Sequence, residues 1–131
     1  LFCINFNEAR ALSEMDGLDL LSMSRRILDL GPKSLIIKDG ENGSHYFDSK
    51  NHFSIKAFPV NEVIDTTGAG DAYIGGILMG KMSGLSIFDA MKMGAVTASF
   101  CIEGVGVEGL LKINDLEFEK RLAWMNTNHT S

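Results

Sequence analysis

The most informative segment of this chain is Asp65-Thr66-Thr67-Gly68-Ala69-Gly70-Asp71-Ala72-Tyr73-Ile74-Gly75-Gly76. Its glycines allow a sharp turn and a close approach of the backbone to a ligand, because no Cβ stands in the way. We expect a helix to begin near Gly70, where unpaired N–H groups and the positive end of the dipole suit a phosphate. Asp71 lies among those donors. The alternative is an ordinary strand-to-helix turn in which Asp71 only stabilises the helix dipole.

Composition limits what this turn can belong to. The 131 residues, 45% of them hydrophobic, are enough for one core and one domain. A net charge of −5 argues against a nucleic-acid partner, so small molecules are the expected ligands. No apolar run approaches the roughly 20 residues of a membrane span, and no secretion signal is recognisable. We therefore expect a cytoplasmic protein with no membrane partner, in which Cys3 and Cys101 are free thiols.

The residue pattern predicts alternating strands and helices, and therefore an α/β fold. Strands are expected at 1–4, 34–38, 44–47, 53–57 and 61–64, and helices at 7–14, 18–30, 69–82, 86–102 and 115–125. Ser86 is a predicted N-cap with Asp89 in a capping box, and Asn114 or Asp115 is expected to cap the last helix. Residues 104–109 are predicted to form a loop.

The polar residues 126–131 are predicted to form a frayed tail. His45, His52 and His129 have no partners at catalytic spacing, so we interpret them as surface or strand residues.

Two other glycine patterns are rejected as nucleotide motifs. Residues 75–82 match a P-loop up to Lys81, but Met82 stands where a Ser or Thr hydroxyl must reach Mg²⁺, and the segment reads as a helix. Residues 104–109 spell GxGxxG, yet they follow a helical segment instead of a strand.

Residues 65–76 closely resemble the C-terminal signature DTTGAGDxFxGG of the ribokinase-like, or PfkB, carbohydrate kinases, with Tyr73 in place of the usual Phe. Residues 5–8 resemble the NxxE motif of that family. Residues 38–43 resemble its strand and GxxG nucleotide loop, and residues 90–106 fall where its helix and loop close over adenine. The four segments occur in the family's order.

The resemblance implies a ribokinase-like, Rossmann-like three-layer α/β/α fold, of which residues 1–131 would be the incomplete C-terminal half. This half would hold the nucleotide and catalytic-base elements, without the sugar-binding part and the lid. The implied activity is transfer of the γ-phosphate of ATP to an alcohol of a sugar or nucleoside, with little activity in the isolated chain. The alternative is a non-catalytic nucleotide- or anion-binding module. An unpaired parallel strand would favour a homo-oligomer or a complementing N-terminal half.

The resemblance also implies roles in phosphoryl transfer. Asp71 would be the general base that takes the proton of the acceptor hydroxyl. The N–H groups of Gly68, Ala69, Gly70 and Asp71 would form the anion hole. Asp65 resembles a residue that shapes a monovalent-cation loop, which implies K⁺, although an Asp before two threonines is also a good turn former.

The remaining implied site residues lie earlier in the chain. Asn5 and Glu8 would arrange Mg²⁺ and its waters, or they would merely cap a helix. Lys38, Gly40 and Gly43 would border the nucleotide, and the same glycines also suit a hairpin turn.

Overall fold

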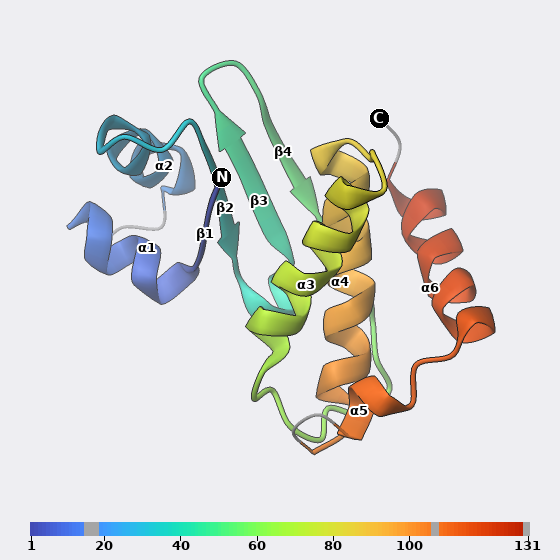
Figure 1. Ribbon diagram of the computed structural model, residues 1–131. Helices are drawn as coiled ribbons and strands as arrows, with labels where there is room; N and C mark the ends of the chain where they lie inside the picture. The colour runs from blue at the N-terminus through green and yellow to red at the C-terminus, as the bar shows by residue number, and fades with distance from the viewer. Residues whose placement is uncertain (15–18, 106–107, 130–131) are drawn as a thin grey trace. The chain divides into compact units, whose positions relative to one another are not determined.

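The computed structural model describes residues 1–14, 19–105 and 108–129. It divides into two compact units, Leu1–Ser54 and Ile55–Ser131, and its elements are labelled in Figure 1. The first unit contains β1 (Phe2–Asn5), α1 (Phe6–Ser13), α2 (Leu20–Asp29), β2 (Ser34–Lys38), the 3₁₀ helix η1 (Gly40–Asn42), β3 (Ser44–Asp48) and most of β4 (His52–Ile55). The second contains α3 (Ala69–Met82), α4 (Ile87–Ile102), α5 (Glu108–Leu111) and α6 (Asp115–Asn128).

The first unit is built around a sheet with the strand order β1-β2-β3-β4 (Figure 1). β1 and β2 are parallel, with Phe2 opposite Leu35 and Asn5 opposite Lys38. β2 and β3 are antiparallel. The carboxyl ends of β1 and β2 therefore lie at the same edge of the sheet, which is where open α/β sheets bind ligands.

Helices α1 and α2 cover one face of this sheet and form the core of the first unit. Its buried members are Ile4, Ala9, Ile27, Leu35, Ile37 and Phe47. Because side chains alternate along a strand, Ile36 points to the opposite face from its two neighbours. All three isoleucine and leucine side chains of β2 are fully buried, which explains why this strand reads as a continuous apolar run.

Helices α3 and α4 form the core of the second unit, and glycines let them approach closely. A Cβ built on Gly76 would lie 2.7 Å from Gly94 Cα, from the carbonyl oxygen of Met93 and from Thr97 Oγ1. A Cβ on Gly94 would lie 2.8 Å from the carbonyl oxygen of Tyr73. Residues 75–82, which match a P-loop in spacing, are thus part of α3, and Gly76 serves the packing of this helix on α4.

Three expectations about the second unit are wrong. Residues 61–64 form no strand; instead, the N–H groups of Ile64 and Asp65 donate to the carbonyl oxygen of Ile102, at 2.7 and 3.2 Å. The predicted frayed tail is helical to Asn128. His129 is buried rather than on the surface, because it accepts a hydrogen bond at Nε2 from the N–H of Lys56 at 2.8 Å. Residues 130 and 131 of the predicted tail lie outside the described residues.

The other predicted helices and strands are confirmed with small shifts of boundary. Asp89 Oδ1 pairs with Lys92 Nζ at 3.0 Å, so the predicted capping box is not confirmed. Ser86 caps α4 by accepting from the N–H of Asp89, and Asn114 rather than Asp115 caps α6. Of the predicted loop at 104–109, residues 106 and 107 lie outside the described residues and Glu108 already belongs to α5. No helix in the described part of the chain has both the length and the apolar character needed to cross a bilayer.

Candidate active site

Asn5 and Glu8 form a reciprocal cap at the carboxyl end of β1. Asn5 Oδ1 accepts from the N–H of Glu8 at 2.8 Å, and the N–H of Asn5 donates to Glu8 Oε1 at 2.9 Å. This capping box begins α1 directly where the strand ends. Both side chains are exposed. The cap engages one carboxylate oxygen of Glu8, so the capping interpretation is confirmed while a second oxygen stays available to a ligand.

Lys38 and the glycine turn after it lie at the same edge of the sheet as Asn5. The parallel register sets Lys38 opposite Asn5. Beyond Lys38 the chain turns through η1, and the N–H of Asp39 donates to the carbonyl oxygen of Gly43 at 2.7 Å. Gly40 and Gly43 have φ values of 54° and 90°, which only glycine adopts without strain. The predicted hairpin role of these glycines is therefore correct, and the turn lies at the same edge of the sheet as Asn5.

The charges at this edge act on the neighbouring thiol of Cys3. Burial raises the pKa of Cys3, the positive charge of Lys38 lowers it, and the negative charge of Glu8 raises it. Cys3 thus experiences the fields of both charged groups. One cation and one carboxylate therefore lie near the end of the parallel strand pair.

The second group of predicted residues forms a single turn at the start of α3. Asp65 Oδ1 accepts from the N–H of Thr67 at 2.9 Å, which is the local bond of an Asx turn. Gly68 is the N-cap of α3 with φ of 82°, a left-handed conformation that requires glycine. The turn-forming role of Asp65 is therefore confirmed.

Asp71 is the third residue of α3 and is exposed. The first intrahelical bond is made by the N–H of Ala72, which donates to the carbonyl oxygen of Gly68 at 2.9 Å. The N–H groups of Gly70 and Asp71 precede that bond and belong to the unpaired first turn. The N–H of Ala69 instead donates to the carbonyl oxygen of Thr66 at 3.2 Å. Of the four predicted anion-hole donors, Ala69 is thus engaged within the turn itself.

Cys101, which the sequence did not connect with this site, lies beneath the turn. Its thiol donates to the carbonyl oxygen of Thr67 at 3.5 Å, and a Cβ on Gly68 would lie 3.7 Å from its sulfur. Burial raises the pKa of Cys101, and the carboxylates of Asp65 and Asp71 raise it further. A neutral, small side chain therefore supports the turn from below without adding charge.

The structure thus gathers the predicted residues into two groups, one in each unit. Asn5, Glu8, Lys38, Gly40 and Gly43 share the carboxyl edge of β1 and β2. The stretch 65–71 forms the turn before α3. Sequence reasoning missed Cys101 and the carbonyl of Ile102, because contacts across more than 30 residues leave no local pattern.

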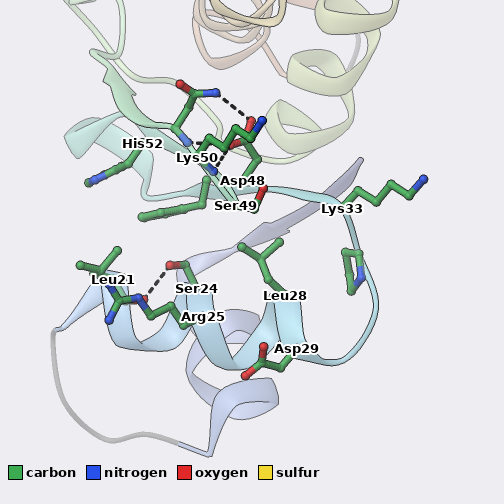
Figure 2. A pocket seen from close by; sticks show the side chains of 13 residues that line it. Leu21, Ser24, Arg25, Leu28, Asp29, Lys33, Asp48, Ser49, Lys50 and His52 are labelled. Atoms are coloured by element: carbon green, nitrogen blue, oxygen red, sulfur yellow. Dashed lines mark hydrogen bonds between the residues drawn. The ribbon is translucent and has the colours of Figure 1, made fainter.

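A groove in the first unit lies away from these residues. Figure 2 shows it between α2 and the turn after β3, with a volume of about 660 Å³. That turn lies at the opposite edge of the sheet from Lys38, because Ser34 at the start of β2 pairs with Asp48 at the end of β3. The side chain of Lys33 points away from the groove (Figure 2). No predicted site residue lines it.

Residues 1–113 match the model of the pfkB family carbohydrate kinases. The chain therefore belongs to this family, which confirms the resemblance read from its motifs. The uncharacterized sugar kinase YegV of Escherichia coli is 33% identical over 104 residues, which are 78% of this chain and 32% of that protein. The 5-dehydro-2-deoxygluconokinase of Clostridium beijerinckii is 36% identical over 80 residues, 60% of this chain and 23% of that one.

The fold is similar to that of solved ribokinases. The structure of Arabidopsis thaliana ribokinase complexed with ribose and ATP matches with a TM-score of 0.80 at 25% identity, covering 92% of this chain and 39% of the other. The predicted ribokinase-like α/β fold is therefore confirmed. The chain spans about a third of the length of the relatives that it matches.

Proposed function

We propose that this chain carries the catalytic-base and nucleotide-loop part of an ATP-dependent phosphotransferase acting on an alcohol group of a sugar or nucleoside. The observation that carries the proposal is the position of Asp71. Its exposed carboxylate lies in the first turn of α3, directly after the left-handed Gly68. A base must reach the acceptor hydroxyl where charge develops on the transferred phosphate, and this turn places a carboxylate beside helix N–H donors.

The N-terminus of α3 would serve as the anion hole of this reaction. The N–H groups of Gly70 and Asp71 precede the first intrahelical bond, and the helix dipole adds a positive potential. The N–H groups of Gly68 and Ala69 would complete the anion hole. Ala69 would then donate to the phosphate in place of the carbonyl oxygen of Thr66, to which it now donates. Donors fixed before the reaction stabilise developing charge without reorganising.

The carboxyl edge of the sheet in the first unit is the proposed nucleotide-binding part of the chain. Lys38 supplies a cation beside the turn at Gly40 and Gly43, where the absence of side chains lets the backbone approach a phosphate or ribose. ATP is the proposed donor, in keeping with the Arabidopsis ribokinase that is complexed with ATP.

The donor set at Asn5 and Glu8 fits Mg²⁺. Both side chains offer oxygen, which Mg²⁺ prefers, and the cap uses one carboxylate oxygen of Glu8. The described residues contain no cluster of three or more His, Cys, Asp or Glu that could hold a metal, so Glu8 and Asn5 would hold the ion through water. The ion would neutralise phosphate charge. For K⁺ the proposed residue is Asp65, whose carboxylate forms the turn with the N–H of Thr67.

The sugar or nucleoside would be selected by residues outside this sequence. The chain matches only 32% of the Escherichia coli relative. In the described part of the chain, β1 is the outermost strand and pairs with β2 alone. Leu1 and Phe2, at the start of this strand, are 63% and 37% exposed. We propose that a further segment of the family domain, or a second copy of the chain, pairs with that edge. The 131-residue chain alone should then transfer little phosphate to ribose, fructose or adenosine.

The substitution Asp71→Asn tests the proposed base. In the complete domain we expect turnover to fall by about 10² to 10⁴-fold, while the dissociation constant for ATP stays within about threefold, because the amide keeps the shape and the N–H donors remain. Asp115→Asn is the matched control. Asp115 is an exposed first-turn acid of another 14-residue helix, so it reports the loss of a dipole-stabilising charge alone.

Each result has a defined meaning. Loss of turnover in Asp71→Asn with normal turnover in Asp115→Asn supports the base. Equal turnover in both variants would contradict it. A complete domain that binds ATP yet transfers phosphate to no sugar or nucleoside would favour the alternative, a nucleotide-binding module without catalysis.

A further inference from the structure

Helix α6 lies wholly beyond the residues that match the family model, yet it contacts the end of α4. The family match ends at residue 113, and α6 begins at Asp115. Figure 1 shows α6 alongside α4 within the second unit. The C-terminal end of α4 also receives the chain that leads into the 65–71 turn, through the carbonyl of Ile102. Two segments far apart in sequence therefore meet at one helix end.

Arg121 is the residue of α6 that makes this contact. Its side chain is only 10% exposed and forms an ion pair with Glu103, the C-cap residue of α4. Arg121 Nη1 donates to Ser99 Oγ at 2.7 Å, and Arg121 Nε pairs with Glu117 Oε1 at 3.1 Å on its own helix. A planar guanidinium can hold several such partners at once, which a lysine ammonium cannot do with fixed geometry.

Two aromatic rings enclose the same guanidinium. Its central carbon lies 4.0 Å from the ring centroid of Phe100 in α4 and 4.9 Å from that of Phe58. Phe58 belongs to the segment between β4 and the turn, and it also packs edge to face on Trp124 of α6. Arg121 thus contacts both the C-terminal end of α4 and the segment that leads from β4 into the 65–71 turn. Shielding from water strengthens these cation–π contacts.

The bonds from this cluster to Asp71 can be followed residue by residue. Glu103 follows Ile102, whose carbonyl oxygen accepts the N–H groups of Ile64 and Asp65. Asp65 in turn accepts from the N–H of Thr67, and Gly68 then begins α3. Every link is a hydrogen bond or a neighbouring residue, and together the links connect Glu103 with the first turn of α3.

We propose that Arg121 is a positioning residue that fixes the 65–71 turn, and hence Asp71, by holding Glu103 and Phe58 at the C-terminal end of α4. Its relevance to phosphoryl transfer rests on the proposed role of Asp71. The geometry itself does not depend on that role, so the two can be tested separately.

Amide hydrogen exchange measured by NMR tests the proposal without any substrate. Arg121→Met retains the apolar stem and removes the charge. We expect the N–H groups of Ile64 and Asp65 to exchange at least about tenfold faster, as for the loss of one supported hydrogen bond. The amides of Ile77 and Val96 at the α3–α4 contact should change less than about twofold. Lys120→Met, at an exposed position one residue earlier in α6, is the matched control and should change neither set.

Two conservative variants separate positioning from general stability. Arg121→Lys keeps the positive charge but loses the planar set of guanidinium donors. We expect the amides of Ile64 and Asp65 to be more protected in this variant than in Arg121→Met, and less protected than in the wild type. Glu103→Gln weakens the same ion pair from the other side and should repeat the selective loss in a smaller degree. It also keeps the test open if Arg121→Met does not fold.

The proposal is overturned if Arg121→Met leaves exchange at Ile64 and Asp65 unchanged, or if all amides of the second unit lose protection equally. In the complete domain, Arg121→Met should lower turnover while Lys120→Met does not. A wild-type domain with no turnover would refute the proposed phosphotransfer alone, since the exchange data would still show whether Arg121 fixes the turn.

Discussion

Adjacent glycines in α3 give a sharp test of how the site is held. Gly76 faces α4, and a Cβ there would lie 2.7 Å from two backbone atoms and from Thr97 Oγ1. Gly75 faces away, with nothing within 4 Å of a built Cβ. Each Gly→Ala change in a helix gains about 0.8 to 1.0 kcal/mol of propensity. Because both glycines lie in one helix, that gain cancels when the two variants are compared.

The remaining difference is the cost of forcing α3 away from α4. Overpacking a close contact costs about 1 to 3 kcal/mol, and backbone atoms cannot turn aside as a side chain can. We therefore expect Gly75→Ala to stabilise the protein by about 1 kcal/mol. Gly76→Ala should be less stable than Gly75→Ala by about 1 to 3 kcal/mol, which corresponds to a difference in Tm of several degrees.

Urea unfolding followed by circular dichroism measures both variants against the wild type. A change in the distance between α3 and α4 should also affect the 65–71 turn. This turn leads into α3, and it is bonded to Cys101 and Ile102 of α4. Gly76→Ala should weaken ATP binding and Gly75→Ala should not. If Gly76→Ala proves as stable as Gly75→Ala, the close helix contact does not exist as described and the reasoning fails.

Three further predictions concern other parts of the chain. Hydrogen bonds from the N–H of Lys50, from Tyr46 and from the N–H of Asn51 lower the pKa of Asp48 from 3.8 to about 2. The stabilisation by ionised Asp48 is therefore fully present above about pH 4 and lost as pH falls through about 2. The difference in urea midpoint between wild type and Asp48→Asn should shrink from about pH 4 downward and vanish below about pH 2, and a constant difference would refute it. His129 accepts from the N–H of Lys56 and its Nδ1 lies 2.8 Å from the carbonyl oxygen of Met125, so His129→Ala should lower the free energy of unfolding by about 1 to 3 kcal/mol, and an unchanged thermal midpoint would count against it. Burial raises the pKa of both Cys3 and Cys101, so iodoacetamide at pH 7 should alkylate Cys3 slowly and Cys101, at 2% exposure, only on unfolding. Mass spectrometry measures the alkylation, and rapid alkylation of Cys101 in the folded protein would contradict its place beneath the turn.

Local chemistry explains which features could be predicted from the sequence. The turn at Gly68, the cap at Asn5 and the helix start at Ser86 each depend on residues within four positions of one another. Such signals are complete in a short window. The family signature then assigned these local features to one fold, which the comparisons confirm.

Long-range contacts explain what was missed. The β-branched residues Val63 and Ile64 favour a strand. However, the N–H of Ile64 donates to the carbonyl oxygen of Ile102 at the end of α4 instead of to a neighbouring strand. The local sequence predicts that His129 belongs to a polar tail. In the structure its ring accepts a hydrogen bond from the N–H of Lys56, 73 residues earlier in the chain. Pairing of this kind depends on tertiary packing, which overrides local preference.

The central claim is that Asp71 is the base of a phosphotransferase site. Its most direct test is the rate at which the complete domain transfers labelled γ-phosphate from saturating ATP to a panel of sugars and nucleosides, compared between wild type and Asp71→Asn. We expect label to reach an acceptor alcohol in the wild type, and we expect the variant to be slower by about 10² to 10⁴-fold. Transfer at the wild-type rate by Asp71→Asn would contradict it.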